Sequence, residues 1–295
     1  MLQSLRRGCA LAFALAAVSF SAFFNAGCQQ EDVLAPSSET IDAELDREAA
    51  IEASAGLSHA GPTPIAGPTV ITKSGRYRVT EDFQVLEGDG IVIRCSHVVL
   101  DLGGHTITGP GNKLGRGIVL EGSHGSVLRK GRLERFGIGV ALLGSNESTV
   151  RQIDIVGGDE FADPPNGVAP QIGILLVNSA ENSILNNDLS LVNLGIFVRG
   201  GDSFENRIRK NQVTGGANGL LGICYNPAEG EGPGGPHDDD LRNNVLNRFG
   251  TGIQFSVGSA ENRFARNTVY YFASPWNDFN GSNEFVGNTT MQVTP

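Results

Sequence analysis

The sequence is poor in several side chains, and each shortage excludes a class of protein. The 295 residues include only four cysteines, two methionines and one tryptophan. Four cysteines in a chain of this length exclude a small scaffold held together by disulfides. Lysine and arginine (22) are outnumbered by aspartate and glutamate (32), which gives a net charge of −10. Because the sequence also lacks a basic stripe, it argues against a nucleic-acid partner.

Residues 1–27 are predicted to be a signal peptide. Arg6 and Arg7 precede an apolar run from Cys9 to Phe24, which is short for a membrane span and typical of a secretory signal. The run ends in Asn25-Ala26-Gly27-Cys28, which resembles a bacterial lipoprotein signal. The resemblance implies that Cys28 becomes the lipidated N-terminus, in an outer-membrane protein that faces the periplasm or the cell surface. Plain secretion is the alternative.

Residues 28–69 are predicted to be an acidic tether. Eight acidic residues and only Arg47 as a base give the segment from Gln29 to Pro68 a charge of −7. A short helix could form from Ser38, a suitable N-cap, to Ser54, but Gly61 to Pro68 would break it. An acidic segment of this kind keeps itself extended.

A repeat of a glycine followed by alternating apolar residues predicts the fold of residues 70–295. The clearest example is Gly173-Ile174-Leu175-Leu176-Val177, which has strand periodicity. The repeat begins at Gly90, Gly117, Gly139, Gly173, Gly195, Gly219 and Gly252. Spacings of 22 to 34 residues, with three short strands and no helical pattern in each unit, indicate a parallel β-helix of about seven coils. A leucine-rich repeat would need a Leu-x-x-Leu-x-Leu frame, which is absent.

The predicted corners between strands carry suitable residues. Five residues after the glycine come Gly122, Gly144, Asn178 and Gly200, which tolerate a left-handed backbone. We expect a hydroxyl ladder at the first corner, from Ser96, Ser123, Ser145 and Ser179. We expect an amide ladder at the next corner, from Asn182, Asn206, Asn243, Asn262 and Asn283.

The segment from Lys73 to Ile107, with Val98-Val99-Leu100-Asp101-Leu102-Gly103-Gly104-His105, resembles the opening of right-handed parallel β-helix repeat proteins. These include the NosD-like periplasmic family and the pectin-lyase-like carbohydrate-binding and sugar-hydrolase relatives. The resemblance covers about Lys73 to Asn288 and implies the fold more strongly than an activity. Asp101 and His105 are expected to be structural. Copper handling, which some relatives show, gains no support from Met291 and a few scattered histidines.

Strand alternation predicts an apolar patch on the outside of the middle coils. The second and fourth residues after each glycine should face outward, which places Leu175, Phe197, Leu221 and Ile223 there. The insertions 157–172 and 225–240, a partner, the tether helix or a ligand could cover such a patch. The aromatic cluster near Trp276 could bind sugar or, as an alternative, close the end of the solenoid.

The second insertion holds the most reactive group of residues. His237, Asp238, Asp239, Asp240 and Arg242 are candidate catalytic residues, and the three aspartates are a candidate calcium site. Pro236-His237-Asp238 resembles part of a motif of alginate C5-epimerases, but Gly235 stands where that family has an aspartate. A solvated acidic loop is the alternative.

Cys95 and Cys224 are expected to stay unpaired, because five coils at ~4.8 Å each separate them. The whole sequence favours an exported, lipid-anchored, monomeric β-helix protein that binds polysaccharide or another cell-surface component. A polysaccharide lyase or epimerase and an accessory protein for a periplasmic metalloenzyme are the alternatives.

Overall fold

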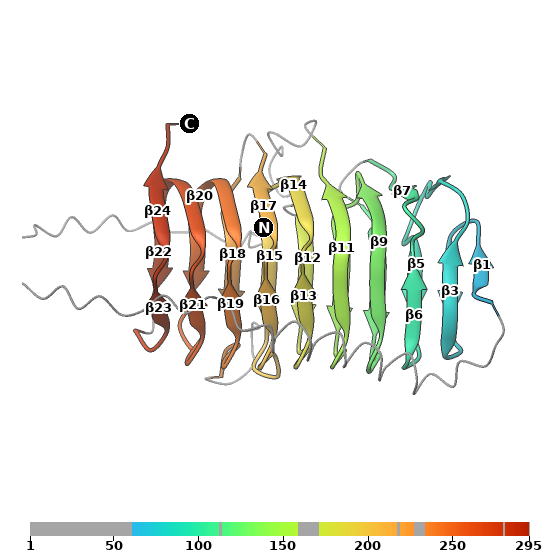
Figure 1. Cartoon of the computed structure of the whole chain (residues 1–295), viewed down its shortest axis with the longest axis horizontal. Coiled ribbons are helices and arrows are strands. Elements are labelled where there is room, and N and C mark those ends of the chain that lie inside the picture. Colours follow the sequence, from blue (N-terminus) through green and yellow to red (C-terminus); the bar gives the residue numbers. More distant parts are fainter. Residues whose placement is uncertain are drawn as a thin grey trace, which may run out of the picture. The chain divides into compact units, whose positions relative to one another are not determined.

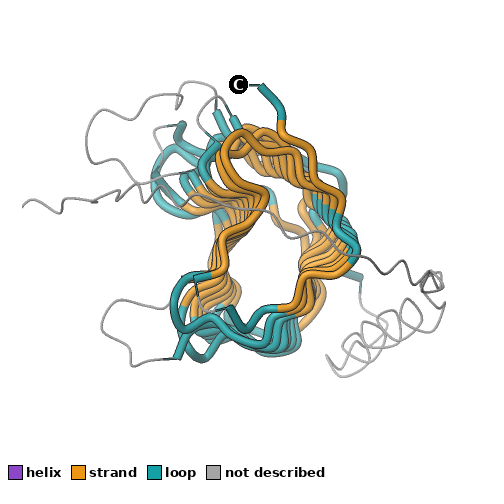
Figure 2. The backbone as a smooth tube through the Cα atoms, turned by 90° about the vertical axis from the view of Figure 1, so that its left-hand side faces the viewer, coloured by secondary structure: helices purple, strands orange, loops and turns teal. Residues whose placement is uncertain are grey.

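The computed structural model describes residues 61–111, 114–158, 171–216, 219–226, 234–279 and 281–294, and the structural statements below concern these residues. They form a right-handed parallel β-helix, in which every strand pairs in parallel with the equivalent strand of the next coil (Figure 1). Figure 2, seen along the axis, shows the coils superimposed. The predicted fold class is confirmed. No apolar helix of membrane-spanning length occurs in the described ranges.

Three stacks of strands, here called faces A, B and C, build the solenoid. Face A contains β2 (Thr69–Ile71), β5 (Ile91–Ile93), β8 (Arg116–Glu121), β10 (Ile138–Leu143), β12 (Ile172–Val177), β15 (Leu194–Arg199), β18 (Leu221–Asn226) and the C-terminal parts of β20 (Val245–Phe255) and β22 (Thr268–Asp278). Face B contains β1 (Thr63–Ile65), β3 (Gly75–Val79), β6 (Val98–Asp101), the N-terminal parts of β9 (Val127–Glu134) and β11 (Thr149–Val156), β13 (Ser183–Leu185), β16 (Arg207–Arg209), β19 (Asp240–Arg242), β21 (Arg263–Ala265) and β23 (Glu284–Val286). Face C contains β4 (Phe83–Gln84), β7 (Thr106–Thr108), the C-terminal parts of β9 and β11, β14 (Asp188–Val192), β17 (Gln212–Gly215), the N-terminal parts of β20 and β22, and β24 (Thr289–Gln292).

Because β1 and β2 already pair within these stacks, the solenoid begins before the predicted boundary at residue 70. The predicted signal peptide and most of the predicted tether lie outside the described residues.

The predicted glycine column exists on face A, with one error. Gly173 and Gly195 occupy adjacent strands in register, as predicted, but the next member is Gly222 and not Gly219. A Cβ on Gly173 would lie 2.6 Å from the carbonyl oxygen of Gly195, and a Cβ on Gly195 would lie 2.3 Å from that of Gly222. The column is therefore glycine because consecutive coils approach too closely there for a side chain.

Alternation along the strands fills the interior with one aliphatic column after another. In β12, Ile174 and Leu176 are fully buried, whereas Leu175 and Val177 are only half-buried. The corners at Gly122, Gly144, Asn178 and Gly200 have positive φ, as predicted. Inward-facing aromatic rings replace aliphatic side chains toward the C-terminal end, where Trp276 stacks on Phe285 at 5.0 Å.

Polar ladders join the coils at two corners. The Ser145 hydroxyl accepts the backbone N–H of Ser123, and the Ser179 hydroxyl accepts that of Ser145. Ser96 is not in this ladder, because its hydroxyl accepts the N–H of His124 instead. An amide ladder runs through Asn182, Asn206, Asn262 and Asn283, as predicted. The prediction that Asn243 belongs to this ladder is wrong. Asp239 occupies the remaining position.

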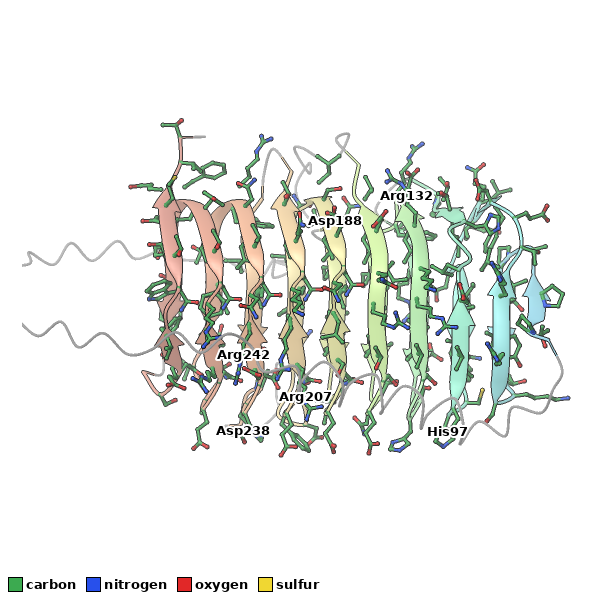
Figure 3. The ribbon with its side chains drawn as sticks, in the orientation of Figure 1. His97, Arg132, Asp188, Arg207, Asp238 and Arg242 are labelled. Atoms are coloured by element: carbon green, nitrogen blue, oxygen red, sulfur yellow. The ribbon has the colours of Figure 1, made fainter. Side chains whose placement is uncertain are left out.

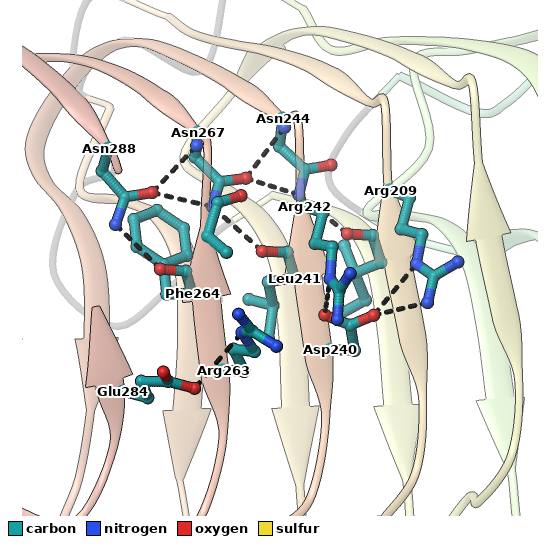
Figure 4. A network of polar contacts seen from close by, with 12 residues as sticks. Arg209, Asp240, Leu241, Arg242, Asn244, Arg263, Phe264, Asn267, Glu284 and Asn288 are labelled. Atoms are coloured by element: carbon teal, nitrogen blue, oxygen red, sulfur yellow. Dashed lines mark hydrogen bonds and ion pairs between the residues drawn. The ribbon is translucent and has the colours of Figure 1, made fainter. Parts of the chain in front are cut away.

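A second amide ladder follows the next corner and was not expected from the sequence. It contains Asn187, Asn211, Asn244, Asn267 and Asn288, in which each Nδ2 donates to the Oδ1 of the next. Figure 4 shows the last three of these amides. Each amide thus satisfies the backbone of a neighbouring coil as well as another amide. The buried polar groups thereby hold consecutive coils in register.

Candidate functional site

The three aspartates of the predicted site point in three directions. Asp238 lies at the corner before β19, with a left-handed backbone (φ 56°) and an exposed side chain. Asp239 faces the interior and is 1% exposed. Asp240 begins β19 on the outer side of face B. The strand alternation that builds the coil thus separates their carboxylates. No group of three or more His, Cys, Asp or Glu side chains that could hold a metal ion occurs among the residues that the structure describes.

Asp239 is an acid in a column of amides. Its Oδ1 accepts the N–H of Asn206 at 2.7 Å, as an asparagine Oδ1 does in the neighbouring coils. Its Oδ2 accepts the hydroxyl of Tyr225 at 2.8 Å. Burial is the main cause that raises the pKa of Asp239 to about 8, although these hydrogen bonds oppose the shift. Asp239 is therefore part of the structural ladder, and its burial favours the protonated form of its carboxyl group.

His237 and Asp238 remain together at the surface. The two side chains form a hydrogen bond of 2.9 Å between His237 Nδ1 and Asp238 Oδ2. The His237 ring also stacks on Phe204 of the preceding coil, with centroids 5.5 Å apart and planes inclined by 5°. Of the five predicted catalytic residues, these two form one group and Asp240 and Arg242 form another.

Asp240 lies between two arginines on face B. Its Oδ2 accepts Nε of Arg209 at 3.1 Å and a second guanidinium nitrogen of the same residue, and its Oδ1 accepts Nε of Arg242 (Figure 4). Arg207 and Arg263 flank Asp240 on adjacent strands in the same row. Figure 3 shows Arg207 and Arg242 in the lower part of the view, away from Arg132 and Asp188. The arrangement can bind an anion.

The sequence did not reveal this collection of arginines. The expectation that the domain lacks a basic stripe is wrong. Arg209 and Arg242 are 33 residues apart and Arg242 and Arg263 are 21 residues apart, so these arginines meet only when the coils stack. One signal was present: arginine occurs one and three residues after a ladder amide, in Asn206-Arg207-Ile208-Arg209 and again in Asn262-Arg263.

The two residues expected to be structural do make structural contacts. Asp101 Oδ1 accepts the N–H of Gly103 at 2.8 Å, and its Oδ2 accepts Nε of Arg129 at 3.3 Å. His105 contacts Asp82, whose carboxylate also accepts the N–H of Thr106. These contacts join the first coils.

The outer apolar patch differs from the predicted one. Leu175 and Phe197 are half-buried, and the expectation for Ile223 is wrong because the column shifts to Gly222 and turns Ile223 inward. The buried outward-facing cluster lies earlier, at Val92, Val119 and Ala141. Of the two insertions that were predicted to cover the patch, residues 159–170 and 227–233 lie outside the described residues.

Residues 103–291, well over half of the chain, match the family described as periplasmic copper-binding protein (NosD). The chain therefore belongs to the NosD family. It is a periplasmic β-helix protein, which agrees with the predicted export. No curated protein matches the NosD-family chain.

Solved structures resemble this NosD-family protein in fold alone. A DFA-IIIase from Arthrobacter chlorophenolicus A6 without its lid has 13% identity and a TM-score of 0.51, covering 87% of this chain and 78% of the enzyme. A variant tailspike protein of E. coli bacteriophage HK620 has 14% identity and a TM-score of 0.50, covering 90% and 62%. XylC, solved with xylose, has 11% identity and a TM-score of 0.50, covering 70% of this chain and only 38% of XylC.

The described residues do not fit a copper centre of the kind that the family description suggests. Copper in proteins takes imidazole, thiolate and thioether ligands. Cys95 and Cys224 are free thiols five face-A strands apart, and Met291 lies on β24. His97 and His124 meet edge to face with centroids 5.8 Å apart, and His124 contacts Glu147 at 3.6 Å. These donors supply no three-ligand group.

Proposed function

We propose that this NosD-family protein is lipid-anchored to the outer membrane through Cys28 and binds polysaccharide or another cell-surface component. The signal sequence supports export, and the family description supports a periplasmic location. The Gln that follows Cys28 favours the outer membrane over the inner one, by its resemblance to other lipoproteins.

The observation that carries the proposal is the outward-facing group Arg209, Asp240 and Arg242. The guanidinium groups hold the carboxylate between them, so Asp240 is engaged in positioning charged side chains rather than available as a free base. Asp239, the other acid of the predicted catalytic set, is enclosed in the core. A surface of ordered guanidinium groups supports binding better than acid–base chemistry.

A glycan array probed with the full mature protein tests this function. We expect binding to a defined subset of polysaccharides, retained after mild washing. Absence of binding to every glycan on the array would contradict the proposal and favour an accessory role beside a periplasmic metalloenzyme.

Catalysis is the second candidate, and one observation favours it. The hydrogen-bonded pair His237 and Asp238 lies at the surface at the corner before β19, and Arg242 is the last residue of that strand. A lyase or epimerase needs a base near a group that neutralises a uronate. Incubation with uronate polymers should then release unsaturated product that absorbs in the ultraviolet, or change the C5 configuration seen by NMR, and His237→Ala should abolish either change. If wild-type protein produces neither change, catalysis is excluded for those polymers.

A further inference from the structure

Three consecutive coils place six cationic side chains on one side of face B. Arg207 and Arg209 extend from β16, Arg242 from β19 and Arg263 from β21. Lys210 and Arg266 follow β16 and β21 at the corner, where both have a left-handed backbone (φ 57° and 55°). We call these six residues the cationic patch.

The strand register fixes the layout of the cationic patch. Arg207, Asp240 and Arg263 are paired positions in one row, and Arg209 and Arg242 are paired positions in the next. Their inward neighbours Ile208, Leu241 and Phe264 are fully buried, so the charged side chains must lie on the outside. Adjacent strands of a sheet lie ~4.8 Å apart, so Arg209 and Arg242 are one strand spacing apart along the solenoid axis. Arg207 and Arg263 are two strand spacings apart, with Asp240 between them.

The carboxylates near the cationic patch leave it with excess positive charge. Asp240 accepts hydrogen bonds from Arg209 and Arg242 and thereby orients both guanidinium groups. Glu284, on the next coil, contacts Arg263 at 3.2 Å. Within the part of the chain that the structure describes, Arg207, Lys210 and Arg266 have no ion pair. Three of the six cations are thus paired with two acids, Asp240 and Glu284. Glu205, Asp238 and Glu261 lie at the corner before the same three strands, and the six cations outnumber these five acids.

The cationic patch is accessible to a large ligand. Arg263, Lys210 and Arg266 are exposed, and the side chain of Arg242 is 38% exposed. The ends of guanidinium groups that are already held by a carboxylate lose little rotamer freedom when they bind a second anion. The surface is ordered by the fold and extends over three coils.

We propose that the cationic patch binds an anionic polysaccharide, whose carboxylate or sulfate groups lie along the solenoid axis and contact the guanidinium groups of successive coils. The inference deepens the proposed function, on which it rests, by naming the class of glycan and the face that binds it. An extended polyanion can contact cations on all three coils at once, since arginine binds carboxylate and sulfate oxygens through paired N–H donors. Among polyanions, a glycan fits a periplasmic protein better than a nucleic acid does.

The test compares two triple variants of the full mature protein on immobilised polygalacturonate. Arg207→Gln, Lys210→Gln and Arg266→Gln together remove the three patch cations that have no ion pair. Lys73→Gln, Arg199→Gln and Arg248→Gln together remove the same charge from positions outside face B. Dextran serves as the uncharged probe and duplex DNA as the other polyanion, and thermal unfolding verifies that both variants fold.

We expect wild-type protein to bind polygalacturonate, with an affinity that falls as sodium chloride is added. The patch variant should bind about tenfold more weakly, and the control variant within about twofold of wild type. If both variants lose affinity for polygalacturonate equally, the cationic patch is not the binding site. If the wild-type protein binds duplex DNA as tightly as polygalacturonate, the ligand is not specifically a glycan.

Failure of the inference can be told apart from failure of the proposed function. If dextran binds as well as polygalacturonate and neither variant weakens the binding of either, polysaccharide binding stands and the proposal of an anionic ligand is wrong. Absence of binding to polygalacturonate, dextran and every other glycan on the array would overturn both.

Discussion

The Tyr225 hydroxyl lies 2.8 Å from Oδ2 of Asp239, and both residues are completely enclosed in the β-helix. Neighbouring coils place an amide where Asp239 stands, and aliphatic or phenylalanine side chains where Tyr225 stands. The acid therefore comes with a hydrogen-bonding partner that other coils lack. Burial also raises the pKa of Tyr225, so the phenol keeps its proton and can donate it to the carboxyl.

The first prediction is that Asp239→Asn stabilises the protein at pH 8. The pKa of Asp239 rises from 3.8 to about 8 on folding, so between these pH values the folded chain holds a proton that the unfolded chain has released. The free energy of unfolding should then fall as pH rises from about 4 to about 8 and become level above it. Asp239→Asn should remove this slope and raise stability at pH 8 by at least about 1.4 kcal/mol. Urea unfolding across the pH range measures both effects.

Asn206→Asp is the matched control for the first prediction. It places a second carboxyl on the equivalent rung, and it should add a slope of the same sign. If the free energy of unfolding of Asp239→Asn keeps the full wild-type slope with pH, the pH dependence arises elsewhere and the prediction that Asp239 is protonated in the ladder is wrong.

The second prediction concerns the close approach of coils at the glycine column. A Cβ on Gly173 would lie 2.4 Å from Leu189 Cδ2 and 2.6 Å from the Gly195 carbonyl oxygen. Gly173→Ala should therefore destabilise the protein by about 1–3 kcal/mol, since backbone must move to admit the methyl group. Gly67→Ala, where a Cβ would meet no atom within 4 Å, should change stability by less than about 0.5 kcal/mol. Chemical denaturation of the two variants tests the pair, and equal losses would argue against the tight column.

The sequence predicts the architecture because the features that define a coil are local. A glycine, two inward apolar residues and a corner that tolerates positive φ all lie within six residues, as from Gly173 to Asn178. The error at Gly219 has a physical cause: Gly219 and Gly222 are both followed by apolar residues, and only the pairing of Ile223 with Ile196 identifies the one that packs.

The candidate site was less predictable, because the direction of each side chain depends on that register. Sequence places Asp238, Asp239 and Asp240 side by side, whereas the coil turns one to the corner, one inward and one outward. The reverse holds for Arg209 and Arg242, which are 33 residues apart in sequence and are paired on adjacent strands. Proximity in the sequence therefore did not reveal that the three carboxylates point apart or that the arginines come together.

The third prediction is that the two thiols differ in reactivity and form no disulfide with each other. Cys224 is 5% exposed, and burial raises the pKa of its thiol to about 12. Burial also raises the pKa of the Cys95 thiol, but Cys95 is only half-buried and remains accessible to a reagent. Because the thiolate is the reactive form, iodoacetamide at pH 8 should label Cys95 in native protein and leave Cys224 unlabelled. After denaturation without reductant, both should be labelled. A peptide in which Cys95 and Cys224 are linked would contradict the arrangement of coils.

The last prediction concerns the anchor. Cys28 precedes the described solenoid, which begins at residue 61, so its removal should leave the β-helix intact. If Cys28 carries acyl chains, Cys28→Ala should release the protein from membranes, because each buried methylene contributes about 0.8 kcal/mol to membrane binding and no other part of the sequence after the signal has a comparable apolar run. Fractionation after a salt wash, with thermal unfolding of the released protein, measures both expectations. Cys95→Ala is the control and should remain with the membrane. A Cys28→Ala protein that still sediments after the wash would contradict lipid anchoring through Cys28.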